Sequence, residues 1–182
     1  IEPGKIDLSL EILKKIFTEN QLDYFYSVSF ENGNLCYGMS VKSNTAIHID
    51  LMEGYFSKGS ELFSFDKLYQ QTEFYNGFKV LNRLYTGLMV FIYKQFGHKK
   101  PQLKEEYRDI IFQTYNDYPE FKILLNELIG DYLSKIICQK IKQKKFDEML
   151  IYSDKLTRQL TNYSFRKNFL KTFKGRLRFY FQ

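Results

Sequence analysis

Tryptophan is absent from the 182-residue chain, and proline, histidine and cysteine are scarce, with three, two and two copies. The two cysteines, Cys36 and Cys138, are too few and too far apart for a disulfide framework, which favours a reducing compartment. The longest near-apolar run, Leu84 to Phe96, is broken by Lys94 and is shorter than the ~20 residues that cross a bilayer. No signal peptide precedes it, and the chain begins at Ile1 rather than Met. We therefore expect a cytoplasmic protein cut from a longer one, with a membrane-peripheral location as the alternative.

The motifs of several enzyme classes are also missing. His48, His98 and the two cysteines have none of the short paired spacings of a zinc site. A catalytic Ser/His/Asp or Cys/His set needs no fixed spacing and is left open, but the chain has no Gly-x-Ser-x-Gly nucleophile motif. It also lacks the phosphate-binding Gly-x-x-x-x-Gly-Lys-Ser/Thr loop. We expect both cysteines to be buried as small apolar residues.

The chain is instead rich in aromatic side chains and has an uneven charge distribution. Its 18 Phe and 15 Tyr can fill a dense core. No acidic residue follows Asp154, whereas eight of the 27 basic residues do. The chain up to Asp154 therefore has 19 basic and 21 acidic residues. A basic tail can contact phosphate on nucleic acid, lipid headgroups or a neighbouring domain, and a solvated helix face is the alternative of equal weight. The eight basic residues are Lys155, Arg158, Arg166, Lys167, Lys171, Lys174, Arg176 and Arg178.

The hydrophobic period changes along the N-terminal part of the chain. Residues 8–19 carry apolar side chains at the spacing of an amphipathic helix, with Asp7 as its expected N-cap and Asn20 at its other end. A period of two then indicates strands, separated by Asn32-Gly33, the strongest short-range hairpin signal, and by a turn at 42–45. The sequence therefore predicts a helix and a three-stranded antiparallel meander, with strands at 24–30, 35–41 and 46–52.

The rest of the chain changes from mixed signals to helix. The predicted elements before residue 82 are a loop at 54–59, a short helix at 65–71, a tight turn at Asn76-Gly77 and a short strand at 78–81. From Asn82, a candidate N-cap, the pattern is helical, with breaks at Pro101 and Pro119. The predicted helices are 83–96, 103–115, 120–143, 146–161 and 164–180. Strands followed by helices indicate an α+β fold, divided into an α/β part at 1–82 and an all-helical part at 83–182 with a basic C-terminal helix.

One acidic residue lies in the middle of the predicted third strand. Strand alternation places Asp50, with His48, on the face opposite to Ile47, Ile49 and Leu51. An acid on an apolar strand is costly to bury unless it is paired or binds a metal. Asp50 is therefore our candidate catalytic and metal-binding residue, and a surface-facing or hydrogen-bonded structural Asp is the alternative.

The order of a helix, a meander whose last strand carries this Asp, and a helical bundle resembles an uncharacterised bacterial nucleotidyltransferase-like family of the polymerase-β-like superfamily. The match lies in two segments, Ile47-His48-Ile49-Asp50-Leu51-Met52-Glu53-Gly54 and Tyr75-Asn76-Gly77-Phe78-Lys79-Val80-Leu81. It covers nearly the whole chain through the order of elements. Members occur in surface-polysaccharide gene clusters, often fused to a C-terminal thymidylate-kinase-like domain. The resemblance implies Mg²⁺-dependent nucleotidyl transfer to a small molecule or sugar in capsular polysaccharide biosynthesis.

The resemblance also implies which site residues should be present. In the family, three carboxylates hold two metal ions, which activate a hydroxyl and neutralise phosphates. Two of them form an Asp-x-Asp pair on a strand after a Gly-Ser turn, and the third, from a neighbouring strand, is matched by Asp50. The chain lacks the first two elements, because Gly4-Lys5-Ile6-Asp7-Leu8-Ser9-Leu10 has Ser9 where the second Asp is needed and runs straight into the predicted helix. The chain starts after the motif or has lost it, so we expect it to be inactive alone and to bind no cofactor tightly.

The basic C-terminal segment carries an aromatic stripe. Phe165, Phe169, Phe173 and Leu177 follow a four-residue spacing, which is more often a core face than a ligand platform. A basic amphipathic helix can also lie on an anionic membrane surface. No recognised reader motif supports nucleic-acid binding. The candidate anion or membrane contacts are Arg166, Lys167, Lys171, Lys174, Arg176 and Arg178.

Three functions are consistent with these patterns. The first is a piece of a nucleotidyltransferase, whose partners are a nucleotide and a small-molecule or sugar acceptor. The second is a non-catalytic adaptor that positions a fused or neighbouring P-loop kinase domain. The third is a membrane-surface or phosphate-binding module that acts through the basic tail. Codons for Gly-Ser and Asp-x-Asp upstream of Ile1 would favour the first function, and their absence the second.

Overall fold

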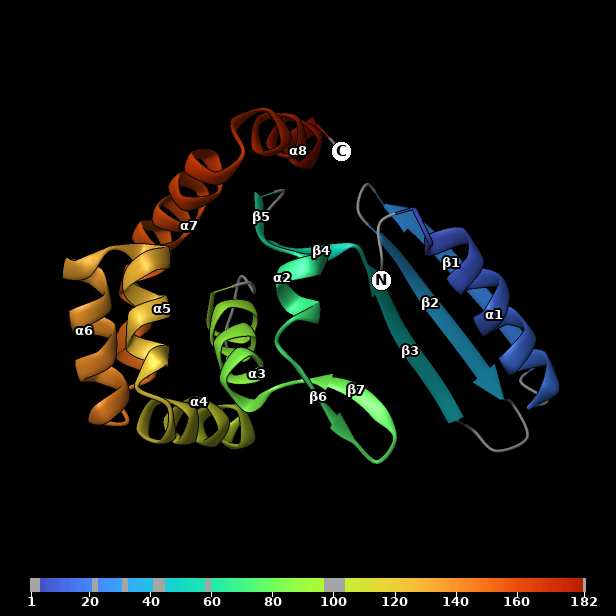
Figure 1. The fold of residues 1–182 in the computed structure, drawn as a ribbon, viewed down its shortest axis with the longest axis horizontal. Helices are drawn as coiled ribbons and strands as arrows, with labels where there is room; N and C mark the ends of the chain where they lie inside the picture. The colour runs from blue at the N-terminus through green and yellow to red at the C-terminus, as the bar shows by residue number, and fades with distance from the viewer. Residues whose placement is uncertain are drawn as a thin grey trace. The chain divides into compact units, whose positions relative to one another are not determined.

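The computed structural model describes residues 4–20, 23–30, 33–40, 45–57, 60–96 and 104–181. The chain separates into two compact units, which are described one at a time: Ile1–Tyr55 with Phe63–Lys67, and Phe56–Leu62 with Leu68–Gln182. Small antiparallel sheets are followed by a helical region, as Figure 1 shows, so the predicted α+β class is confirmed. The second unit takes in residues 72–81 as well as the helices, whereas the sequence-based division was placed after residue 82.

The first unit begins with helix α1 (Ile6–Glu19). Its predicted C-terminal residue is confirmed, because the Asn20 side-chain amide donates to the Ile16 carbonyl at 2.7 Å. The prediction that Asp7 caps the helix is wrong. The helix starts at Ile6, two residues before its predicted start, and Asp7 lies in its first turn, where a negative charge is favourable to the helix dipole.

Three strands follow α1 and form the predicted meander. They are β1 (Tyr24–Phe30), β2 (Gly33–Ser40) and β3 (Thr45–Met52), hydrogen-bonded in the order β1-β2-β3. Both pairings are antiparallel, with Tyr26 opposite Tyr37 and Leu35 opposite Asp50. In the two predicted turns, Asn32 and residues 42–44 lie outside the described residues.

Helix α1 covers one face of this sheet. The Phe17 ring, only 5% exposed, meets the Phe25 ring edge-on with centroids 5.5 Å apart. Cys36 and Leu51 are buried in the core of the same unit. The prediction of a buried Cys36 is therefore confirmed. The alternation of β2, with Cys36 buried and Tyr37 exposed, therefore separates a core face from an open face.

Two short hairpins lie between the meander and the helices. The predicted loop at 54–59 is wrong in part, because β4 (Gly54–Ser57) pairs with β5 (Ser60–Ser64). Tyr55 and Phe63 are buried as a stacked pair with centroids 6.3 Å apart, and burial of these rings outweighs the loop preference of the flanking glycine. Helix α2 (Phe65–Tyr69) confirms the predicted short helix.

The second hairpin joins β6 (Thr72–Tyr75) to β7 (Phe78–Leu81). Its turn residues, Asn76 and Gly77, both have positive φ, at 48° and 81°. This is the backbone that a type I′ turn requires, so the predicted turn and the strand after it are confirmed.

The second unit is mainly helical. The Asn82 side chain accepts a hydrogen bond from the Tyr85 N–H at 3.0 Å and caps α3, as predicted. Its other elements are α3 (Arg83–Val90), a π-helical turn (Phe91–Phe96), α4 (Glu105–Asp117), α5 (Glu120–Ile129), α6 (Asp131–Lys142), a 3₁₀ segment (Asp147–Tyr152), α7 (Ser153–Lys167) and α8 (Phe169–Phe181).

Several predicted helices differ from those observed. The helix expected at 146–161 is a 3₁₀ segment up to Tyr152 followed by α7. The single helix expected at 120–143 is broken at Gly130, whose φ of 81° is incompatible with a right-handed helix. The last helix, expected from residue 164, begins only at Phe169, because α7 continues to Lys167 and Asn168 leaves helical geometry. The core of this unit contains Leu88, Ile111, Phe121, Leu125, Ile137, Ile141, Met149 and Leu156.

Candidate functional site

Asp50 lies at the predicted place in the meander, on its third strand and opposite Leu35. Its side chain is outside the described part of the structure, so only the strand position is known. The register puts position 50 on the same sheet face as Tyr37 and its cross-strand partner Tyr26. Tyr26 is 63% exposed and Tyr37 42% exposed, so this is the face that α1 does not cover.

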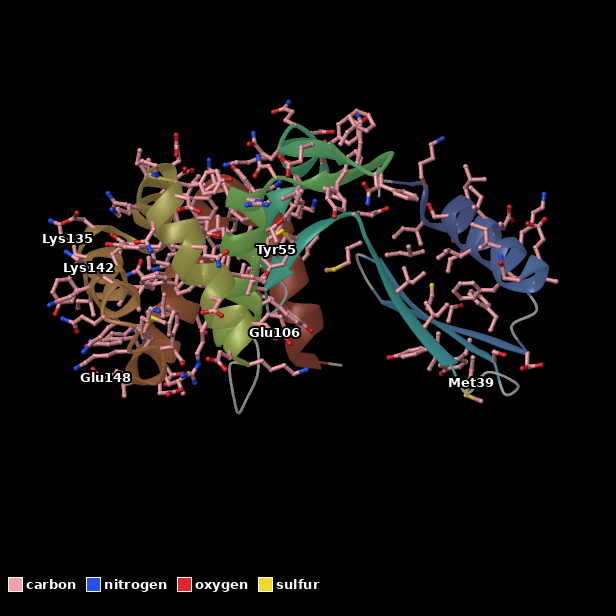
Figure 2. All side chains as sticks on the ribbon, turned by 90° about the horizontal axis from the view of Figure 1, so that it is seen from below. Met39, Tyr55, Glu106, Lys135, Lys142 and Glu148 are labelled. Atoms are coloured by element: carbon pink, nitrogen blue, oxygen red, sulfur yellow. The ribbon has the colours of Figure 1, made fainter. Side chains whose placement is uncertain are left out.

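The open face presents a pair of aromatic rings. The centroids of Tyr26 and Tyr37 are 6.5 Å apart, with their planes tilted by 33°. Met39, two residues further along β2, is also exposed (Figure 2). Aromatic faces of this kind can stack on planar rings of a ligand. Sequence alternation alone could have indicated this pair, since both tyrosines fall on the side of the strands that carries position 50.

The start of α1 lies beside the end of β3. The Gly4 N–H donates to Glu53 Oε1 at 2.8 Å, which joins two residues far apart in the sequence. The segment that faintly matches the family motif is therefore next to the strand that carries Asp50. However, the Ser9 hydroxyl donates to the Lys5 carbonyl at 2.9 Å within the helix, and Asp7 is in the first turn. The segment runs into a helix as predicted, and α1 takes the place of a motif-bearing strand.

A two-metal centre needs several carboxylates close together, and the described side chains can be compared with this requirement. Among the described side chains, no three His, Cys, Asp or Glu residues lie close enough together to hold a metal ion. The Asp50 carboxylate is not among these side chains. Near position 50, one oxygen of Glu53 already accepts the Gly4 N–H. Mg²⁺ requires near-octahedral oxygen coordination, and two ions require several shared carboxylates. The described residues do not fit a two-metal centre.

The basic C-terminal segment is anchored through its small residues. Thr172 and Gly175 are buried, and the Thr172 and Ser164 hydroxyls are hydrogen-bonded at 2.7 Å across the α7–α8 junction. Asn168 Oδ1 accepts the Lys171 N–H at 3.1 Å and closes the first turn of α8. The helix therefore docks through a narrow, partly polar face.

Three members of the aromatic stripe lie elsewhere on α8, whereas Phe165 is on α7 and is half-buried. Phe169 is 61% and Leu170 68% exposed, and Phe173 and Leu177 are exposed as well. The Phe169 and Phe173 rings stack on each other, with centroids 6.1 Å apart and planes within 5°. The expectation that this stripe is a core face is wrong for its three members on α8, because the small side chains of α8 occupy the core side and leave the large ones outside.

The six candidate basic residues have different surroundings. Lys167 pairs with Glu127 at 3.4 Å, and Lys171 pairs with Glu61 at 2.8 Å. Arg166 and Lys174 are exposed and Arg176 is half-buried, whereas the Arg178 side chain is outside the described residues. These residues therefore lie at the end of α7 and along α8, and at least two of them are in ion pairs.

A hollow of about 390 Å³ at the α5–α6 junction was missed by sequence reasoning. It is lined by Gly130 and Tyr132 on one side and by Lys155 and Arg158 from α7 on the other. The sequence analysis noted Lys155 and Arg158 as basic residues. It did not place Gly130 and Tyr132 beside them, because the break at Gly130 was not predicted.

Burial shifts the acid–base behaviour of two other groups. Tyr163 is buried and its hydroxyl donates to Glu127 Oε1 at 3.2 Å, and burial together with this carboxylate raises the pKa of Tyr163 well above its usual 10. Burial also raises the pKa of the half-buried Cys138 thiol. A thiol shifted in this direction is less nucleophilic, which does not favour a catalytic role for Cys138.

Comparison with family models, with curated proteins and with solved structures gives no match to this chain. The resemblance to the nucleotidyltransferase-like family therefore stays a prediction based on the two quoted segments and the order of elements. Among the helices that the structure describes, none has the length and apolar character needed to cross a bilayer.

Proposed function

We propose that the chain is a nucleotidyltransferase-like module of surface-polysaccharide biosynthesis that does not catalyse transfer by itself. The observation that carries this proposal is the meander, with position 50 on the sheet face that α1 leaves open. A site for a nucleotide and a sugar or small-molecule acceptor needs an accessible face of this kind. The non-catalytic part of the proposal rests on the sequence, which lacks the Gly-Ser and Asp-x-Asp elements that hold the two metal ions in the family it resembles.

The open face can offer a nucleotide only a modest free energy of binding. Stacking of one base on an aromatic side chain contributes roughly 1–3 kcal/mol. A dissociation constant of 1 mM requires about 4 kcal/mol. The Tyr26–Tyr37 pair, without metal ions to hold the triphosphate, therefore supports binding that is weaker than millimolar.

Calorimetric titration with Mg²⁺ and each nucleoside triphosphate tests this proposal directly. We expect no saturable heat at micromolar nucleotide for the chain or for its Asp50→Asn variant. Micromolar binding by the unchanged chain that Asp50→Asn abolishes would show that a complete metal site exists. Micromolar binding that Asp50→Asn leaves intact would place the nucleotide elsewhere and contradict the proposed site.

The sequence encoded upstream of Ile1 separates the two versions of this function. If Gly-Ser and Asp-x-Asp are encoded there, the missing carboxylates are supplied by a preceding strand, and the extended chain should transfer nucleotides. If they are not encoded, the module is an adaptor for an attached or neighbouring kinase domain. In that case, adding the upstream residues should leave the calorimetric result unchanged.

A further inference from the structure

Helix α8 has its large apolar side chains outside and its small side chains inside. Thr172 and Gly175 are buried, whereas Phe169, Phe173 and Leu177 are exposed. Exposed aromatic residues that follow one another along a helix form a contiguous apolar surface rather than scattered single residues. Such a surface is usually covered by a partner or by a membrane.

Helical spacing divides the surface of α8 into an apolar arc, a buried side and the borders between them. At about 100° per residue, Phe169, Phe173, Leu177 and Leu170 occupy one arc, and the buried Thr172 and Gly175 lie on the other side of the helix. Lys174 lies at one border of the apolar arc, and Arg176 lies at the other border.

These borders match a helix that lies in a membrane interface. Interfacial helices bury Phe and Leu to a shallow depth and keep Lys and Arg beside them at the level of the headgroups. The exposed Lys174 side chain can extend to the phosphates while its stem covers apolar surface. The 13 residues described for α8, with a rise of about 1.5 Å each, present this apolar face over roughly 20 Å of helix.

From this arrangement we infer that α8 binds the surface of an anionic phospholipid membrane through its Phe169–Leu170–Phe173–Leu177 face. The charge of α8 selects this occupant, because the helix carries four basic residues and no acidic one, although Lys171 is paired with Glu61. Anionic lipids attract such segments by about a fivefold gain in affinity per basic residue near the surface. This inference does not depend on the nucleotidyltransferase-like proposal.

The same charges disfavour the other occupants. In a symmetric dimer the same face of each copy meets its counterpart, so the basic borders of the two helices would be brought together and repel. A nucleic-acid duplex would satisfy the basic borders but would leave the apolar arc in water, since its bases are stacked inside and its phosphate backbone gives the arc no apolar partner.

Co-sedimentation of the full chain with vesicles tests the inference. The vesicles are phosphatidylcholine alone and phosphatidylcholine with 30% phosphatidylserine, each at low and at 0.5 M salt. We expect binding to the anionic vesicles, little binding to the neutral ones, and weaker binding at high salt because surface charges are screened. Absence of binding to anionic vesicles at low salt, or equal binding to both kinds, would overturn the inference.

Paired variants locate the contact on α8. Phe173→Ser should lower anionic-vesicle affinity by about tenfold or more, since its ring loses its apolar burial, and Lys174→Glu by about fivefold or more. The matched controls are Phe74→Ser on β6 and Lys142→Glu on α6, which change exposed residues of the same kinds elsewhere in the helical unit. Equal effects of test and control variants would contradict a specific role for α8.

Two further measurements keep the result interpretable. All four residues are exposed, so circular dichroism and thermal unfolding should be unchanged in each variant. Sedimentation velocity without lipid should give a monomer for the unchanged chain. A dimer that Phe173→Ser dissociates would identify a second copy as the occupant and would overturn the lipid assignment.

Discussion

Glu127 connects several side chains of the helical unit. It accepts the Tyr163 hydroxyl at 3.2 Å and pairs with Lys167 at 3.4 Å. Its charge also contributes to raising the pKa of Tyr85, after burial. Because Tyr163 is buried, its hydroxyl needs this partner to avoid an unsatisfied polar group.

We predict that Tyr163 makes the protein sensitive to alkaline pH. The unfolded chain releases the tyrosine proton near pH 10, whereas the folded chain keeps it because the pKa of Tyr163 is raised. The stabilisation is therefore complete below pH 10 and is lost as the pH rises further. Urea unfolding between pH 8 and 11 should show a steeper loss for the unchanged protein than for Tyr163→Phe.

The control for this prediction is Tyr132→Phe, which changes an exposed tyrosine of α6. It should follow the unchanged protein over the whole pH range. At pH 7, Tyr163→Phe should cost about 0.5–1.5 kcal/mol for the lost hydrogen bond. Parallel pH profiles for the unchanged protein and Tyr163→Phe would show that the phenol does not carry the effect.

Asp50 gives the second prediction. Because position 50 is on the open face of the meander, Asp50→Asn should change the free energy of unfolding by less than about 0.5 kcal/mol. A structural Asp that has lost a buried hydrogen bond would instead cost about 1–3 kcal/mol. Urea unfolding of the two proteins at the same pH distinguishes these outcomes, and a loss above about 2 kcal/mol would remove Asp50 as a candidate site residue.

Capping residues show how far single residues can be read from the sequence. Asn20 and Asn82 make the predicted contacts because their partners are three or four residues away. Asp7 fails because the entry to α1 is fixed by Gly4, which has a φ of 77° and donates to Glu53. That contact joins residues 49 positions apart, and no local pattern can indicate it.

At the scale of elements, the crossing of α3 and α4 depends on one glycine. A Cβ atom added to Gly87 would lie 2.0 Å from Thr114 Oγ1 and 2.6 Å from Thr114 Cβ. The second of these atoms is attached directly to the backbone and cannot rotate away. The two helices can therefore approach this closely only with a glycine at position 87.

We predict that Gly87→Ala destabilises the protein, although alanine is the better helix former. The intrinsic gain is about 1 kcal/mol, whereas overpacking of a core contact costs typically 1–3 kcal/mol and more when backbone must move. We expect a net loss of about 1–2 kcal/mol in chemical unfolding. A variant as stable as the unchanged protein would show that α3 and α4 do not cross at this point.

Elements were predictable where their signals are local. The β6–β7 hairpin follows from Asn76-Gly77, and α1 and the meander follow from their periods. The break at Gly130 was missed because the apolar pattern continues across it, and only the backbone geometry reveals the change of direction. The side of α8 that faces the core was also mistaken, because hydrophobicity alone favours burial of Phe169 and Phe173, and the Ser164–Thr172 hydrogen bond was not predictable.

For the whole molecule, each compact unit carries one of the two candidate sites. The first unit holds the open face of the meander, and the second holds the apolar face of α8. The sequence indicated Asp50 and the basic tail, because both are patterns of residue type. Alternation can place Tyr26 and Tyr37 on the face of position 50, but it cannot show that this face is exposed, since that depends on which face α1 covers. It could not indicate the Gly4–Glu53 contact either, because these residues are far apart in the sequence.

The proposed site depends on Asp50 lying in the third strand of a meander, on its open face. Nuclear Overhauser contacts between backbone protons of β1, β2 and β3 test it most directly. We predict cross-strand contacts between Tyr26 and Tyr37, between Cys36 and Ile49, and between Leu35 and Asp50. Helical contacts across residues 35–52 would contradict the account, and so would a register shifted by one residue, which would transfer position 50 to the face covered by α1.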